Sequence, residues 1–122
     1  MTTAPDPGPG EVGRVSVVIP TYNRAAYLAQ AIDSMRGQLE SDDELIVVDD
    51  GSTDDTADVL ARYDGRIRVV RTPNGGLGAA RNVGIATATG DWIAFHDSDD
   101  VARPGRLALQ RAWVRRRPDV DA

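Results

Sequence analysis

Three carboxylates fall within four consecutive positions, at Asp97, Asp99 and Asp100, directly after a strand-like run at 91–95. Left without compensation, such neighbouring charges repel one another. Hard divalent cations such as Mg²⁺ and Mn²⁺ take oxygen ligands, typically one or two carboxylates together with substrate phosphates. Alternate side chains of an extended segment share a side, so Asp97 and Asp99 are expected to face one way and Ser98 the other. The pattern predicts a divalent-cation site; the alternative is an acidic loop in which Asp100 caps a short turn.

A second pair of carboxylates, Asp49 and Asp50, ends another apolar run. A carboxylate at the end of a strand can accept hydrogen bonds from a nucleobase or a ribose. The alternative is an acid that stabilises the start of the following helix, where negative charge is favourable. That alternative is weaker for Asp49 and Asp50 than for Asp54 and Asp55, because the first two precede the turn.

Three glycines, Gly75, Gly76 and Gly78, lead into a helix-like segment that carries Arg81. Glycines allow a close backbone approach, and a helix N-terminus favours an anion. Arg81, about one turn into the helix, could reach a phosphate in a bidentate manner. The residues alone weigh this phosphate site equally against a glycine-rich turn with Arg81 as a surface charge.

Composition excludes several other classes of site and partner. The chain has no cysteine and no lysine, which removes thiolate zinc sites and the lysine of a phosphate-binding P-loop. Its net charge of −5 disfavours a nucleic-acid binder with a basic face. No apolar run approaches the roughly 20 residues of a membrane span, so we expect a cytoplasmic protein without an integral membrane segment. His96, the single histidine, is interpreted as a wall residue rather than a catalytic base.

The polar groups follow short apolar segments that alternate with helix-like segments. Strands are predicted at 15–19, 45–48, 67–70 and 91–95, and helices at 25–35, 52–63, 77–88 and 104–117. This alternation implies right-handed crossovers and an α/β fold, a Rossmann-like parallel sheet with helices on both faces. Ligands bind such a sheet outside the carboxyl ends of its strands, which is where each polar group falls. The polar residues are therefore expected to meet at one edge.

The apolar spacing within the helices predicts which faces pack on the sheet. Tyr27 and Leu28 are expected to open the inward face of the first helix. Ala57 is expected inward in the second helix, and Leu77 and Ile85 in the third.

Boundary signals predict where the elements and the domain begin and end. Pro20 is expected to stop the first strand, Ser52–Asp55 to form a capping box, and Pro104 to occupy the first turn of the last helix. Residues 1–13 have no apolar period and are interpreted as a flexible lead-in to one truncated domain at 14–122. Because residues 118–122 look like the approach to a further strand, we expect an open sheet edge that invites a homodimer or a partner chain.

Four motifs, in order and spacing, closely resemble the nucleotide-binding half of family 2 glycosyltransferases with the GT-A fold. They are VSVVIPTYNR at 15–24, LIVVDDGSTD at 45–54, GAARNVGI at 78–85 and GDWIAFHDSDD at 90–100. The resemblance covers about residues 14–109 and implies a partial GT-A fold with strand order 3-2-1-4.

The resemblance implies metal-dependent, inverting transfer of a sugar from a nucleotide-diphospho-sugar, commonly UDP-linked, to an acceptor that stays unknown. The residues that it assigns to nucleotide-sugar binding are Pro20, Thr21, Tyr22, Asp50, Arg81, Asp97 and Ser98. Asp50 matches the acid that holds the base, and Arg81 the basic residue near the diphosphate. Asp97 and Asp99 match the ligands of Mn²⁺ or Mg²⁺.

The family's general base and acceptor pocket belong to the half that follows the D-x-D segment. The resemblance therefore identifies no catalytic base in this chain. His96 stands where the family usually has an apolar residue. A second hypothesis is kept beside the enzyme: a truncated, non-catalytic nucleoside-diphosphate-binding module, or one part of a split enzyme.

Overall fold

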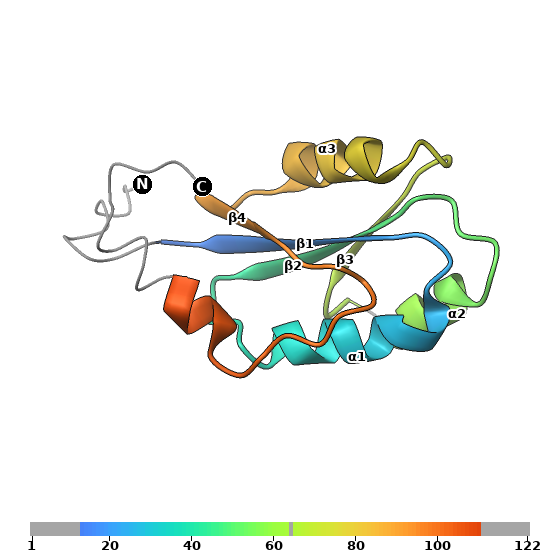
Figure 1. Cartoon of the computed structure of the whole chain (residues 1–122). Helices are drawn as coiled ribbons and strands as arrows, with labels where there is room; N and C mark the ends of the chain where they lie inside the picture. The colour runs from blue at the N-terminus through green and yellow to red at the C-terminus, as the bar shows by residue number, and fades with distance from the viewer. Residues whose placement is uncertain (1–12, 64, 111–122) are drawn as a thin grey trace.

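A computed structural model describes residues 13–63 and 65–110 of the chain. Strands and helices alternate along this part of the chain, as the sequence predicts (Figure 1). The elements are β1 (Val15–Thr21), α1 (Ala25–Arg36), β2 (Glu44–Asp49), α2 (Thr56–Ala61), β3 (Arg68–Arg71), α3 (Leu77–Thr87) and β4 (Trp92–Phe95). Residues 106–110 form a further helical segment.

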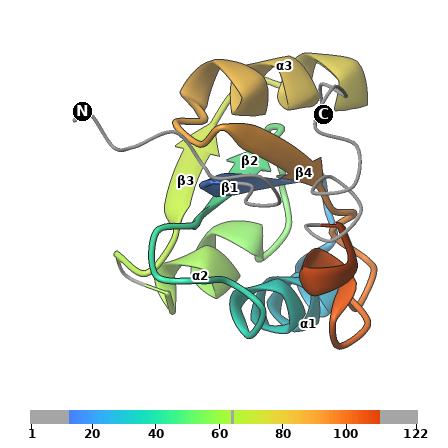
Figure 2. The same cartoon turned by 90° about the vertical axis from the view of Figure 1, so that its left-hand side faces the viewer.

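The four strands form one parallel sheet in the order β3-β2-β1-β4, which confirms the predicted order. Figure 2 shows α3 on one face of the sheet, with α1, α2 and the segment 106–110 on the other. All carboxyl ends therefore meet at one edge, where Thr21 of β1 lies beside Asp49 of β2. The predicted α/β class, with helices on both faces, is confirmed.

The core consists of two apolar layers, because the two central strands are buried on both faces. Val17, Ile19 and Val47 pack toward α1 and α2. Val18 and Ile46 pack toward α3, which approaches closely: a Cβ built on Gly84 would lie 2.3 Å from Val18 Cγ1. The β-branched runs seen in the sequence thus form the buried centre of the sheet.

The prediction that Pro20 ends the first strand is wrong, since β1 continues to Thr21. Val18 O accepts a hydrogen bond from His96 N, whereas Thr21 O accepts one from Asp50 N. Even-numbered residues of β1 therefore turn their peptide groups toward β4. The β4 pairing ends at Val18 opposite Phe95, so Pro20 lies past the point where its missing N–H would be needed.

The predicted helix faces are correct only in part. Leu28 is buried, but Tyr27 is 54% exposed, and Leu77 and Ile85 of α3 are also exposed. Ala57 of α2 points to solvent as well. In α3 the close approach to β1 selects the smallest residues for the inward face, and larger apolar side chains are turned outward.

The inward residues share one property, which is that each reaches the sheet or its neighbouring helix. They are Leu28, Ala31, Ile32 and Met35 in α1, Thr56, Val59 and Leu60 in α2, and Ala80 and Gly84 in α3.

Two helix starts differ from the prediction. The capping box at Ser52–Asp55 is not formed; α2 begins at Thr56, whose N–H donates to Asp54 Oδ1 at 3.0 Å. The other Asp54 oxygen accepts from Ala25 N at 3.1 Å, so one carboxylate serves the N-termini of both α1 and α2. Hydrogen bonds from the Thr56 side chain and from backbone N–H groups lower the pKa of Asp54.

The predicted last helix starts two residues late. Pro104 lies in a turn, and the described helical segment begins at residue 106. The rest of that predicted helix, the lead-in at 1–12 and the approach to a fifth strand lie outside the described residues.

Candidate functional site

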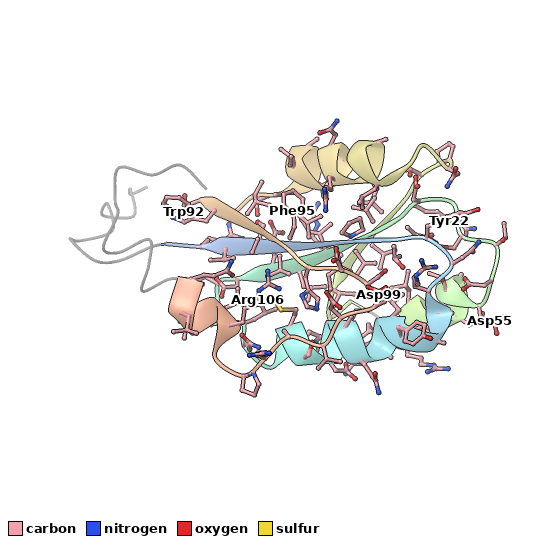
Figure 3. All side chains as sticks on the ribbon, in the orientation of Figure 1. Tyr22, Asp55, Trp92, Phe95, Asp99 and Arg106 are labelled. Carbon is pink, nitrogen blue, oxygen red and sulfur yellow. The ribbon has the colours of Figure 1, made fainter. Side chains whose placement is uncertain are left out.

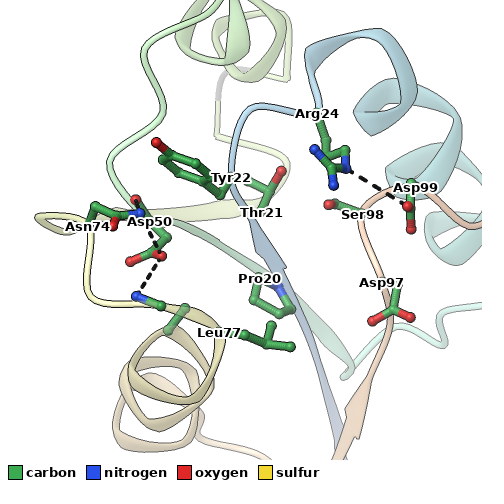
Figure 4. Close-up of a pocket in the computed structure, with 12 residues that line it drawn as sticks. Pro20, Thr21, Tyr22, Arg24, Asp50, Asn74, Leu77, Asp97, Ser98 and Asp99 are labelled. Carbon is green, nitrogen blue, oxygen red and sulfur yellow. Dashed lines mark hydrogen bonds and ion pairs between the residues drawn. The ribbon is translucent and has the colours of Figure 1, made fainter.

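A cavity of about 430 Å³ lies at the carboxyl ends of β1, β2 and β4 (Figure 4). It contains seven of the eight residues predicted for nucleotide-sugar or metal binding. Its lining residues are Pro20, Thr21, Tyr22, Arg24, Asp50, Asn74, Gly76, Leu77, Ala80, Asp97, Ser98 and Asp99. Sequence reasoning did not assign Arg24 or Asn74 to the site, although both lie in the polar runs that follow strands.

Asn23 holds the loop after β1 against the loop after β2. Its backbone adopts a φ of 51°, a left-handed conformation that asparagine tolerates better than most residues. Its Oδ1 accepts hydrogen bonds from Thr53 N at 2.8 Å and Asp54 N at 3.3 Å, while its own N–H donates to Ser52 Oγ at 2.9 Å. This junction places the half-exposed Tyr22 ring at the mouth of the pocket.

Asp50 is buried at the back of the pocket and ties β2 to the loop before α3. Its carboxylate accepts hydrogen bonds from Gly75 N at 2.9 Å, Gly76 N at 3.0 Å and Asn74 Nδ2 at 3.2 Å. Gly51 is required beside it, because its φ is +78° and a Cβ there would lie 2.7 Å from Asn74 N. A carboxylate has about four lone-pair sites, so one acceptor site of Asp50 stays available for a ligand.

The same contacts correct the phosphate cradle predicted from the glycines. Two N–H groups before α3, those of Gly75 and Gly76, already donate to the Asp50 carboxylate. The close backbone approach that glycine permits is used by a side chain of the protein. Of the two interpretations of the glycine-rich segment, the structure favours a turn.

The acidic turn, Asp97–Asp100, forms the opposite wall. Carboxylate oxygens of Asp97, Asp99 and Asp100 lie within 4.8 Å of one another, and all three residues are exposed. Ser98 between them is buried, as the alternation predicts. The prediction of a metal site omitted Asp100, whose backbone N–H closes the turn on Asp97 O at 3.2 Å.

This donor set fits a hard divalent cation, because three carboxylates converge with little compensating charge. Among the residues that the structure describes, Arg24 is the one cation near them, with its Nε 3.8 Å from Asp99 Oδ2 (Figure 4). Both side chains of that pair are about half exposed, so solvent screens the attraction.

Arg81 is the predicted site residue that the structure does not bring into the pocket. Its guanidinium carbon lies 5.6 Å from the centroid of the Phe95 ring. Its Nε is buried and has no hydrogen-bond partner in the described part of the chain. Arg81 lines the neighbouring hollow, which it shares with Phe95, Asp97 and Asp100.

His96 lies in the wall behind the acidic turn and is 6% exposed. Its Nδ1 lies 2.6 Å from an Arg106 terminal nitrogen, and its Nε2 lies 2.9 Å from Asp100 O. A guanidinium can only donate, so Nδ1 accepts, and Nε2 carries the proton that it donates to the Asp100 carbonyl. With both ring nitrogens engaged, His96 is a wall residue and not a free base.

Comparison with known proteins gives a consistent result. The family model described as "Glycosyl transferase family 2" matches residues 16–121. An uncharacterised glycosyltransferase of Nostoc sp. is 44% identical over 98 residues, which are 77% of this chain and 30% of that protein. No helix in the described residues is long and apolar enough to cross a membrane.

Two solved structures share the fold. Staphylococcus aureus TarS in complex with UDP superposes with a TM-score of 0.74 at 32% identity, covering 83% of this chain and 32% of that one. A Pyrobaculum calidifontis mannosyltransferase in complex with GDP-Man and Mn²⁺ gives a TM-score of 0.74 at 26% identity, covering 91% and 35%. The chain thus spans about a third of the length of these proteins.

Proposed function

Because the chain belongs to glycosyl transferase family 2, we propose that its pocket binds a UDP-linked sugar together with Mn²⁺ or Mg²⁺. The protein would transfer that sugar, with inversion, to an acceptor whose identity is open. One observation carries the proposal: a single cavity joins a buried carboxylate with a spare acceptor site, Asp50, to the acidic turn at its other wall.

The base would bind at the Asp50 side. The Tyr22 ring offers a stacking surface, and the spare oxygen site of Asp50 suits the imide N–H of uracil. Thr21 Oγ1 is buried without a hydrogen-bond partner in the described residues, although Thr21 lines the pocket. A buried hydroxyl of this kind usually has a partner, which a bound nucleotide would supply. Pro20 would form the floor beside it.

The diphosphate and the cation would bind at the other wall. Asp97 and Asp99 would hold the cation, with Asp97 also close to the ribose and Ser98 behind them. When bound, the cation acts as a Lewis acid that stabilises the departing nucleoside diphosphate. Arg81 would approach the diphosphate from the neighbouring hollow. The remaining task of this chain's residues is to hold the donor in position for attack.

Calorimetry tests this proposal directly. UDP and GDP are titrated into the chain with and without Mn²⁺, using Asp99→Ala and the exposed Asp58→Ala as a charge-matched control. We expect UDP to bind more tightly than GDP, and Mn²⁺ to strengthen binding in the wild type and the control only. Equal Mn²⁺ dependence in Asp99→Ala would refute the cation assignment.

A second function is favoured by the share of the relatives that the chain covers, 30% for the Nostoc protein. This polypeptide would then bind the nucleoside diphosphate without catalysing transfer, or act with another chain. Incubation of the purified chain with UDP-sugars distinguishes the two cases: release of UDP, by transfer or by hydrolysis, would exclude the non-catalytic module. A cytoplasmic location is proposed with either function.

A further inference from the structure

The acidic turn needs a restraint, because three carboxylates within 4.8 Å of one another repel. Inside the turn, one backbone hydrogen bond of 3.2 Å joins Asp100 N to Asp97 O. The strongest external contact reaches the backbone: the His96 Nε2–H donates to Asp100 O at 2.9 Å. No described contact of His96 occupies a carboxylate oxygen of the turn, so those oxygens stay available.

His96 is itself held in one orientation by Arg106. The guanidinium donates to His96 Nδ1 at 2.6 Å and to Phe95 O at 2.7 Å, and it also contacts Met35 Sδ of α1 at 3.8 Å. Figure 3 shows Arg106 on the α1 side of the sheet. The backbone N–H of His96 continues the β4 pairing by donating to Val18 O at 3.0 Å. The imidazole thus links a rigid strand end to the acidic turn.

We propose that His96 is a positioning residue for the cation site, which it serves by holding the Asp100 carbonyl while Arg106 fixes its tautomer. The inference rests on the proposed function, since it concerns how the acidic turn binds a divalent cation. Partners that lie behind metal ligands orient those ligands, and their loss weakens metal affinity by about 10- to 100-fold. His96 acts here through the backbone of the turn.

Two substitutions separate the two ring nitrogens. His96→Gln places an amide N–H near the position of Nε2 and retains a donor for Asp100 O. His96→Asn places an amide oxygen near the position of Nδ1, which satisfies Arg106 but leaves Asp100 O without its donor. We expect His96→Gln to keep the Mn²⁺ dissociation constant within about threefold of wild type and His96→Asn to raise it about tenfold or more.

Mn²⁺ binding is measured by electron paramagnetic resonance without nucleotide, and thermal unfolding is recorded for each variant. Val59→Ala, in the α2 side of the core, serves as the control for lost stability alone. We expect that variant to melt earlier yet bind Mn²⁺ as wild type does. If His96→Asn lowers the melting temperature but leaves Mn²⁺ affinity unchanged, the positioning role is excluded while the proposed function stands.

A second measurement needs no metal. Because the chain has a single histidine, ¹⁵N NMR of the imidazole reports on His96 alone. We expect the neutral Nε2–H tautomer in the wild type, and its loss as the single dominant form in Arg106→Gln. A proton on Nδ1 in the wild type would overturn the inference. A wild type with the expected tautomer that binds no Mn²⁺ would overturn both the inference and the metal part of the proposed function.

Discussion

The two ends of the same sheet treat their carboxylates in opposite ways. At the amino end, Glu44 accepts hydrogen bonds from Ser16 Oγ at 2.6 Å, from Thr89 N at 2.6 Å and Oγ1 at 2.9 Å, and from Arg68 at 3.2 Å. At the carboxyl end, the three carboxylates of the acidic turn have one cation, Arg24, within 4.0 Å among the described residues. Glu44 has no acceptor site to spare, whereas the turn has many.

This difference shows how a structural acid is distinguished from a binding acid. Burial raises the pKa of Glu44, but the hydrogen bonds from Ser16, Thr89 and Arg68 outweigh it and lower that pKa to about 2. A charge with a full set of donors stabilises the fold and attracts no ligand. Asp50 is intermediate, since three donors from the loop before α3 leave it one free site. The following predictions test this order.

The largest expected loss of stability comes from Glu44→Gln. The new amide group would place a donor against the Ser16 and Thr89 donors, and the charge would be lost. We expect the free energy of unfolding to fall by about 2 to 3 kcal/mol in urea denaturation, with UDP affinity retained at temperatures where the variant is folded. Asp58→Asn, an exposed acid, should change stability by less than about 0.5 kcal/mol. A loss no larger than that of the control would contradict the structural role of Glu44.

Acid titration of the wild type probes the same group. The folded pKa of Glu44 lies at about 2, below its ordinary value of 4.5, so its contribution is complete above pH 4.5 and is lost as the pH falls toward 2. We expect a stability loss of about 2 to 3 kcal/mol across this window, much of it missing in Glu44→Gln. Parallel curves for the two proteins would show that other acids govern the transition.

Asp50→Asn should show both kinds of effect. The variant keeps one acceptor oxygen but turns an amide donor toward the Gly75 and Gly76 N–H groups. We expect unfolding to become easier by about 1 to 2 kcal/mol and UDP affinity to fall about tenfold or more. Urea denaturation and calorimetry measure the two effects. Full UDP affinity together with the stability loss would reassign Asp50 to structure alone.

The smallest expected change in stability is that of Asp99→Asn. Its side chain has only the exposed pair with Arg24, and losing that pair is offset by relief of repulsion within the acidic turn. The free energy of unfolding should stay within about 0.5 kcal/mol of wild type while Mn²⁺ affinity falls. A stability loss as large as that of Glu44→Gln would erase the distinction between the two ends of the sheet.

Several features of the fold and site were predictable from local sequence. Apolar runs such as 15–19 and 45–48 identify the strands, and their alternation with helices implies a parallel sheet. Because parallel strands share one carboxyl edge, the polar residues that follow them had to converge. That argument placed Tyr22, Asp50 and Asp99 in one pocket without knowledge of any distance between them.

Other features depended on contacts between residues far apart in the chain. The exposed Leu77 follows from the close approach of α3 to β1, which periodicity does not encode. The donors to Asp50 come from residues 24 to 26 positions away, and Arg24 meets Asp99 only when two loops fold over the same edge. Sequence by itself determined which groups reach the carboxyl edge, because strand direction is a local property. Tertiary structure decided which of them are already satisfied by the protein and which remain free for a ligand, because hydrogen bonds depend on atomic distances that only packing sets.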